Sequence, residues 1–288
     1  MMNQPPAAAM LVLCLLNAAL ATLVACRLAG TRAGVWAGAL LALSPIHTLV
    51  SRAAGPEAPL VLLLLAALWL VLGLELQPSP LRATAAGFAL GALAASGVAA
   101  FAAVALVSLA WLTWPSERRA LAAWAAGAAV ALVGATALLG FARSPFDDGE
   151  IPPWIPATTL EAVVRCTGAS FTRVLGLEYQ LVVPHARYVL PLTALCVALL
   201  VRGAMRLPAR PRALLVAGAF VPFALGAVMA LVTGRVTPLQ ANRLLAALPF
   251  VALLMASGLA SLGGTRAWAA GTAVAGTLAA FLALALAR

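Results

Sequence analysis

The chain has 288 residues, of which 64% are apolar and 9% are charged, whereas a soluble domain has roughly 25% charged residues. A water-soluble fold could not bury this much apolar surface, so we expect lipid to surround most of the chain. The formal charge of +10 comes from arginines in small groups between apolar runs, which is typical of membrane loops and argues against a nucleic-acid partner.

The apolar runs predict an all-α, polytopic transmembrane protein with about ten membrane segments, since a spanning helix needs roughly 20 apolar residues. We expect one transmembrane domain over residues 1–288. In chain order the predicted segments are 7–26, 34–50, 58–76, 83–95, 98–113, 119–141, 186–205, 213–233, 243–262 and 267–287. Residues 83–113 carry no charge and are too long for one ordinary crossing, so we predict two short helices with a break at 94–97.

The distribution of arginine predicts the orientation of these segments. With the N-terminus outside, the short inner loops are rich in arginine, as the positive-inside rule requires. The arginines assigned to the inner side are Arg27, Arg32, Arg82, Arg118, Arg119, Arg202, Arg206, Arg210, Arg212 and Arg266. A single helix over 83–113 would move the cluster at 202–212 outside, which favours the split. We therefore expect a multi-pass protein of the plasma (inner) membrane.

One connection is long: residues 142–185 predict an extracytoplasmic loop within the membrane domain. Apolar residues at helical spacing over 158–173 predict a short amphipathic helix in it, capped by Thr158 or Thr159. The four cysteines form no CxxC pair, and we expect them to be small buried hydrophobic residues rather than a disulfide or metal framework.

The short polar stretch 51–57 between two apolar runs holds the first candidate site. Arg52 could bind a phosphate, and Glu57 could bind a sugar hydroxyl or a metal, or accept a catalytic proton. The alternative is structural: Pro56 starts a helix, Glu57 stabilises its positive end, and Arg52 reaches lipid phosphate. His47, one turn before Arg52, is expected to be an interface side chain, and Pro45 is expected to kink or end its helix.

Three further positions are candidates on the outer side. Asp147, Asp148 and Glu150 could bind a divalent cation or act as acid and base, or else form a solvated turn. Arg187 lies where the long loop re-enters the membrane, and Arg243 opens a late apolar run. Either arginine could hold a phosphate or serve as an interface anchor.

The stretch from Leu28 to Gly73 resembles a block of the polytopic glycosyltransferases of GT-C fold. These include the bacterial relatives of the dolichyl-phosphate-mannose protein mannosyltransferases (family 39) and of the lipid A aminoarabinose transferase. The matching residues are Arg32, Ser44-Pro45, Arg52 and Pro56-Glu57 in this block, and Arg243, Pro249 and Gly258 in a late helix. The region 85–112 is similar to the next pair of short helices of the family, with Ser96 where the family has lysine.

The resemblance implies transfer of a sugar from a polyprenyl-phosphate carrier to a cell-envelope acceptor at the outer face. In the family a carboxylate acts as base on the acceptor and cations stabilise the leaving phosphate. We expect Arg52, Glu57 and Arg243 to be site residues at the outer face, with Glu57 as the candidate catalytic carboxylate. Arg187 is a further candidate phosphate ligand, and a divalent cation is possible. In the family, another helix and a large outer loop with the main catalytic acid precede segment 7–26. We therefore expect a shortened relative in which Glu57 or the run 147–150 replaces that acid, or an inactive one. The alternatives are a transporter or flippase, and a non-catalytic membrane scaffold.

Overall fold

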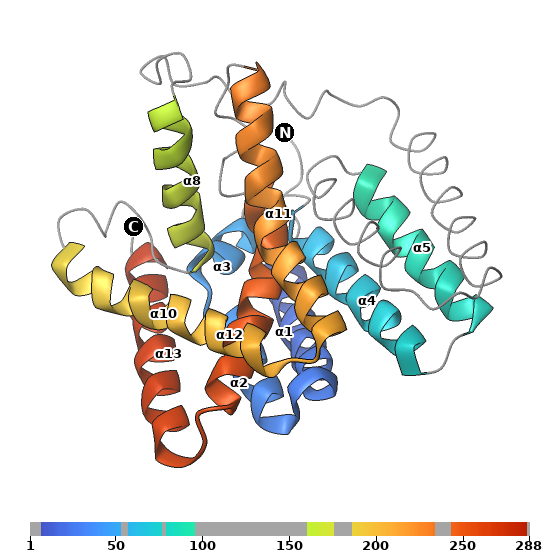
Figure 1. Cartoon of the computed structure of the whole chain (residues 1–288), viewed down its shortest axis with the longest axis horizontal. Helices are drawn as coiled ribbons and strands as arrows, with labels where there is room; N and C mark the ends of the chain where they lie inside the picture. The colour runs from blue at the N-terminus through green and yellow to red at the C-terminus, as the bar shows by residue number, and fades with distance from the viewer. Residues whose placement is uncertain are drawn as a thin grey trace.

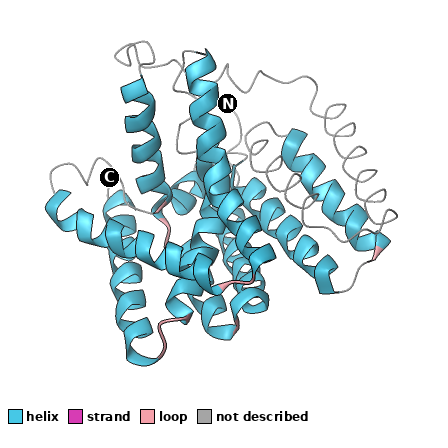
Figure 2. Cartoon of the chain, in the orientation of Figure 1, coloured by secondary structure: helices cyan, strands magenta, loops and turns pink. Residues whose placement is uncertain are grey.

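The computed structural model describes residues 7–52, 57–76, 79–95, 160–175, 186–233 and 243–286. The described ranges are helical and contain no strand (Figures 1 and 2), so the all-α prediction is confirmed for them. The predicted segments 98–113 and 119–141 lie outside the described residues, as does most of the predicted loop 142–185.

The helices follow the predicted apolar runs closely. They are α1 (Ala7–Ala29), α2 (Thr31–Ala42), α3 (Pro45–Arg52), α4 (Glu57–Leu76), α5 (Pro80–Ala95), α8 (Leu160–Val174), α10 (Ala186–Arg206), α11 (Ala209–Thr233), the 3₁₀ helix η3 (Arg243–Ala247), α12 (Leu248–Ala260) and α13 (Gly264–Leu286). The amphipathic helix expected in the long loop is present as α8, and its described start lies two residues after Thr158.

Two of the described helices are long and apolar enough to cross a membrane, namely Val12–Ala29 within α1 and Ala209–Val232 within α11. Pro59–Leu74 in α4 and Leu244–Ala260, across η3 and α12, are shorter apolar helices. The count of about ten membrane segments thus stays a prediction.

The predicted single segment 34–50 is wrong, because the chain breaks there into two helices. Pro45 has no N–H and keeps the preceding residue out of helical geometry, so α2 ends at Ala42 and α3 starts at Pro45. The N–H of Leu43 still donates to the carbonyl of Ala39 at 2.9 Å. With 12 and 8 residues, neither piece reaches the roughly 20 residues of a bilayer crossing. The expectation that Pro45 ends a helix is confirmed.

Helix α12 lies at the centre of the described bundle. Its residues from Leu248 to Leu259 are all buried, and it packs against α1, α2, α10, α11 and α13 (Figure 1). A helix that is apolar on every side belongs in an interior surrounded by other helices. The bundle is therefore organised around α12.

Small residues let the neighbouring helices approach α12. A Cβ on Gly258 would overlap the backbone carbonyl of Leu199 in α10, and a Cβ on Gly203 would overlap the carbonyl of Leu254 in α12. The two glycines therefore bring α10 and α12 into backbone contact. Between α11 and α12, Gly218 leaves room for the ring of Phe250. Such close approach through small residues is how helices associate in lipid, where the hydrophobic effect gives no force between them.

Replacing Gly258 with alanine is expected to destabilise the fold by about 3 kcal/mol or more, because the new methyl group meets rigid backbone rather than a movable side chain. Thermal unfolding of the detergent-purified protein would measure the loss. Gly276→Ala in α13 is the matched control, since a Cβ there meets no atom within 4 Å, and alanine should stabilise that helix by up to roughly 1 kcal/mol. Equal melting temperatures for the two variants would contradict the proposed backbone contact.

Candidate functional site

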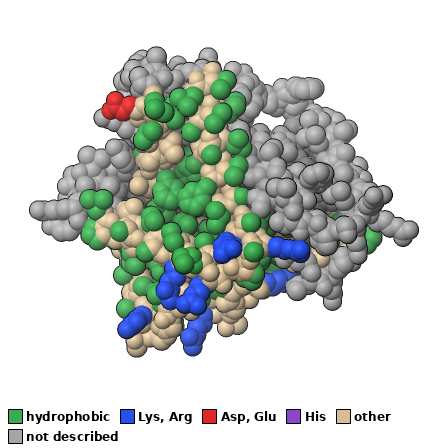
Figure 3. All heavy atoms as spheres, in the orientation of Figure 1, with side chains coloured by type: hydrophobic (Ala, Val, Ile, Leu, Met, Phe, Trp, Pro, Cys, Tyr) green, Lys and Arg blue, Asp and Glu red, His purple; other side chains and the backbone are tan. Residues whose placement is uncertain are grey.

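The described charges divide the bundle into two ends. Figure 3 shows arginine side chains gathered at one end and an acidic side chain at the other, on α8. The arginines with described side chains are Arg27, Arg32, Arg82, Arg202, Arg206, Arg210, Arg212 and Arg266. All of them belong to the set that the charge pattern assigns to the inner side.

Specific contacts hold the connections at the arginine end together. The guanidinium of Arg27, near the end of α1, lies 3.1 Å from the ring centroid of Trp69 in α4, a cation–π geometry. Arg82 in α5 donates to the carbonyl of Gly73 at 3.3 Å. Arg202 in α10 donates from Nε to the hydroxyl of Ser261 at 2.7 Å, and from its terminal nitrogen to the Ser261 carbonyl at 3.1 Å. These contacts join the end of α1 to α4, the start of α5 to the end of α4, and the end of α10 to the turn that follows α12.

The candidate residues from the sequence fall at helix ends. Arg52 is the last residue of α3, Glu57 the first of α4, Arg243 the first of η3, and Arg187 the second of α10. Helix α4 packs against both α3 and η3, so the element that begins with Glu57 adjoins the two elements that carry Arg52 and Arg243. Helix α10 packs chiefly on α12. The side chains of these four residues, and the whole run 147–150, lie outside what the structure describes.

A polar pair lies inside the bundle instead. The imidazole of His47 in α3 is fully buried, and its Nε2 lies 3.0 Å from the amide nitrogen of Asn17 in α1, which is also fully buried. The expectation that His47 is an interface side chain is therefore wrong: α3 packs against α1 and α13, and this packing covers the ring. The pair joins two helices across the interior by a hydrogen bond.

The orientation of the amide sets the tautomer of this ring. With the amide nitrogen of Asn17 facing the ring as donor, Nε2 of His47 accepts and the ring proton resides on Nδ1. Among the described residues, Nδ1 of His47 and the hydroxyl of Ser44 have no hydrogen-bond partner, although both are buried. Buried polar atoms of this kind commonly bind an ordered water or a polar ligand group. The interior thus offers two hydrogen-bonding atoms beside the break between α2 and α3.

The sequence held a signal for this pair. Asn17 is the one amide side chain in the apolar run 7–26, and an amide in a membrane helix usually bonds to another helix. That signal predicts a partner but does not say which residue it is. The choice of His47 follows from the packing of α3 on α1.

No family model matches the chain, and no curated protein or solved structure is significantly similar to it. The resemblance to GT-C glycosyltransferases therefore stays a prediction. Within the described ranges, no three histidine, cysteine, aspartate or glutamate side chains are grouped so that they could hold a metal ion. The four cysteines are free thiols. The expectation that they are small buried residues is confirmed for Cys196, whereas Cys14, Cys26 and Cys166 are half-buried.

Replacing Asn17 with alanine is expected to cost about 1–3 kcal/mol of stability, because Nε2 of His47 would stay buried without its donor. The double variant Asn17→Leu/His47→Leu should recover most of that loss, since it removes both polar partners together. Unfolding in detergent of this double variant and of its two single variants, Asn17→Leu and His47→Leu, would give the coupling energy from the double-mutant cycle. Thr277→Val, at an exposed hydroxyl bonded within its own helix, is the control. Additive single losses would show that the pair is not coupled.

Proposed function

We propose that the chain is a multi-pass protein of the plasma (inner) membrane that transfers a sugar from a polyprenyl-phosphate carrier to a cell-envelope acceptor. The arginine end would face the cytoplasm and the opposite end would carry the reaction. The observation that carries this proposal is the packing of α4 against both α3 and η3. It supports the proposal because those elements begin or end with a carboxylate and two cations, the groups that such a transfer needs.

Each of the three groups has a role in the proposed reaction. The carboxylate of Glu57 would accept the proton of the attacking acceptor hydroxyl as a general base. The guanidinium groups of Arg52 and Arg243 would bind the carrier phosphate and stabilise the charge that develops on it as the bond to the sugar breaks. Arg187 would extend the phosphate site from α10, and a divalent cation held by 147–150 would assist it. Fixed cations act strongly at a membrane surface that excludes water.

The buried pair of His47 and Asn17 supports a second candidate, a transporter or flippase. Ionisable and amide groups within a membrane bundle often line the path of a proton or polar substrate. If the chain is such a transporter, His47→Leu should stop transport driven by a pH gradient in vesicles. Full transfer activity in that same variant would favour the transferase.

The transferase proposal predicts a specific pattern of activity loss. In membrane vesicles supplied with a polyprenyl-phosphate sugar, Glu57→Gln should lower the transfer rate by a factor of about 10²–10⁴, the usual contribution of a general base. Arg243→Ala should lower it by about 10²–10³, the usual loss of one group that stabilises developing charge. Transfer of radiolabelled sugar to the membrane fraction would be measured.

Two substitutions of exposed charges provide the controls for this experiment. Glu161→Gln in α8 removes an exposed carboxylate, and Arg210→Ala in α11 removes an exposed arginine from the other end. Both should leave the rate within twofold of the parent protein. No transfer by the parent chain, or unchanged rates in the Glu57 and Arg243 variants, would exclude the enzyme.

The proposed orientation predicts the result of cysteine labelling. In a variant without the native cysteines, Glu161→Cys in α8 should react with a membrane-impermeant maleimide added outside intact cells, because α8 would lie on the outer face. Arg210→Cys should react only after the cells are opened. Labelling of both positions from the same side would contradict the orientation. It would also contradict the prediction that an odd number of membrane crossings separates the two positions.

A further inference from the structure

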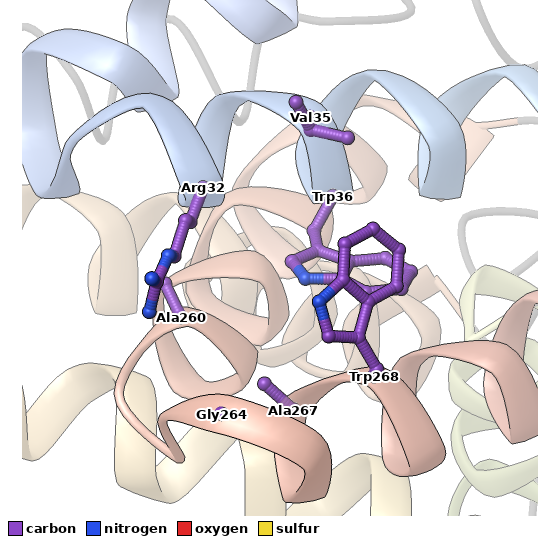
Figure 4. Close-up of a pocket in the computed structure, with 7 residues that line it drawn as sticks. All are labelled: Arg32, Val35, Trp36, Ala260, Gly264, Ala267 and Trp268. Carbon is purple, nitrogen blue, oxygen red and sulfur yellow. The ribbon is translucent and has the colours of Figure 1, made fainter.

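A cavity at the arginine end lies between the start of α2 and the turn that joins α12 to α13. Its volume is about 130 Å³, and it is lined by Arg32, Val35, Trp36, Ala260, Gly264, Ala267 and Trp268 (Figure 4). Arg32 extends from α2 along one side, and the indoles of Trp36 and Trp268 lie together on the other. None of these residues belongs to the proposed transfer site.

Unlike Arg27, Arg82 and Arg202, Arg32 has its guanidinium free for a ligand, and it is the arginine that lines this cavity. Arg27 lies over Trp69, and Arg82 and Arg202 donate to protein oxygens. Arg32 is exposed and makes no hydrogen bond or ion pair with any residue in the part of the chain that the structure describes. A guanidinium carries five donors in a planar fork that matches phosphate oxygens. The cavity therefore presents an unused phosphate-binding group.

The start of α13 adds positive potential to the same cavity. Gly263 and Gly264 have φ angles of 71° and 46°, which glycine adopts without strain, and this turn sets Gly264 at the cavity wall. The first N–H groups of a helix have no partner within it and carry the positive end of its dipole. An anionic group beside Arg32 would thus be attracted both by the guanidinium and by the positive end of α13.

The remaining walls are apolar and open to the outside. Trp268 is 65% exposed and Val35 is 58% exposed, whereas Trp36 is nearly buried. The two indoles meet edge to face with centroids 5.3 Å apart, and the absence of a side chain on Gly271 lets Trp36 lie against α13. Exposed tryptophan beside arginine is typical of the level of lipid headgroups. A free phosphate would use the cation alone, whereas a lipid would also cover Trp268 and Val35.

We propose that this cavity binds an anionic phospholipid of the inner leaflet, with the phosphate on Arg32 and the start of α13, and an acyl chain along Trp268 and Val35. The assignment rests on the membrane placement and orientation proposed above, and it is independent of sugar transfer. The ligand is of the phosphatidylglycerol class, because the other arginines at this end attract negative headgroups. Bound lipid would join α2 to the turn between α12 and α13.

Quenching of tryptophan fluorescence tests the site in the full chain. The protein is reconstituted in phosphatidylcholine vesicles, and brominated phosphatidylglycerol or brominated phosphatidylcholine is titrated in. We expect half-maximal quenching at an about fivefold lower mole fraction for phosphatidylglycerol than for phosphatidylcholine. A difference of this size is the attraction of one arginine near the surface for an anionic lipid. Arg32→Ala should abolish this preference. Arg210→Ala, at an exposed arginine that does not line the cavity, should keep it, and Trp268→Phe should remove most of the preferential quenching.

The outcomes separate this proposal from the others. A preference for phosphatidylglycerol that survives Arg32→Ala, or that is lost equally in Arg210→Ala, would overturn the proposed lipid site. Neither result would bear on the proposed membrane placement. Reversal of the quenching by millimolar inorganic phosphate would show that the cavity binds a free anion, and would overturn the proposal that it binds a lipid. Failure of the parent chain to float with the vesicles would overturn both the lipid site and the membrane placement, whereas a lipid preference without sugar transfer would exclude only the transferase.

Discussion

The backbone contact between α10 and α12 is the constraint on which the rest of the bundle depends. Gly203 and Gly258 face each other's helices where any side chain would meet a carbonyl, so the two axes approach closely along that face. Helix α12 can then be enclosed by α1, α2 and α11 on its other sides. In the proposed membrane location, this enclosure would gain nothing from exclusion of water and would depend on dispersion between well-fitted surfaces. The glycines thus permit an approach of α10 to α12 that any larger side chain at these two positions would prevent.

The break at Pro45 turns one apolar run into two pieces with different environments. Helix α2 keeps Trp36, Leu40 and Leu41 buried in the bundle, and α3 turns to pack on α1 and α13. A continuous helix would have carried His47 along the direction of α2. The break instead brings its ring against Asn17, so a local backbone restriction decides which polar groups meet in the interior.

The sequence predicts the helices well and their contacts poorly, for a physical reason. Apolar runs set helix positions because each run must satisfy its own backbone hydrogen bonds, so α1, α4 and α10 begin and end near the predicted residues. Burial of His47 depends on which helix lies opposite, and no local pattern contains that information. The cavity at Arg32 likewise joins α2 to α13, segments more than 200 residues apart in the chain. The sequence could, however, predict which arginines lie at the same end of the bundle, because the positive-inside rule applies to each loop separately.

The unit formed by α2 and α3 connects the two ends of the molecule. Arg32 lies at its first turn beside the start of α13, and Arg52 ends it next to α4. Helix α13 contacts both α2 and α3, and α12 packs along α2. A group bound at Arg32 would therefore hold one end of a unit whose other end carries part of the proposed phosphate site. Because the two pieces meet at a proline break rather than in a rigid helix, the second piece is held to the bundle by its packing on α1, α4 and α13, and by the hydrogen bond between Asn17 and His47.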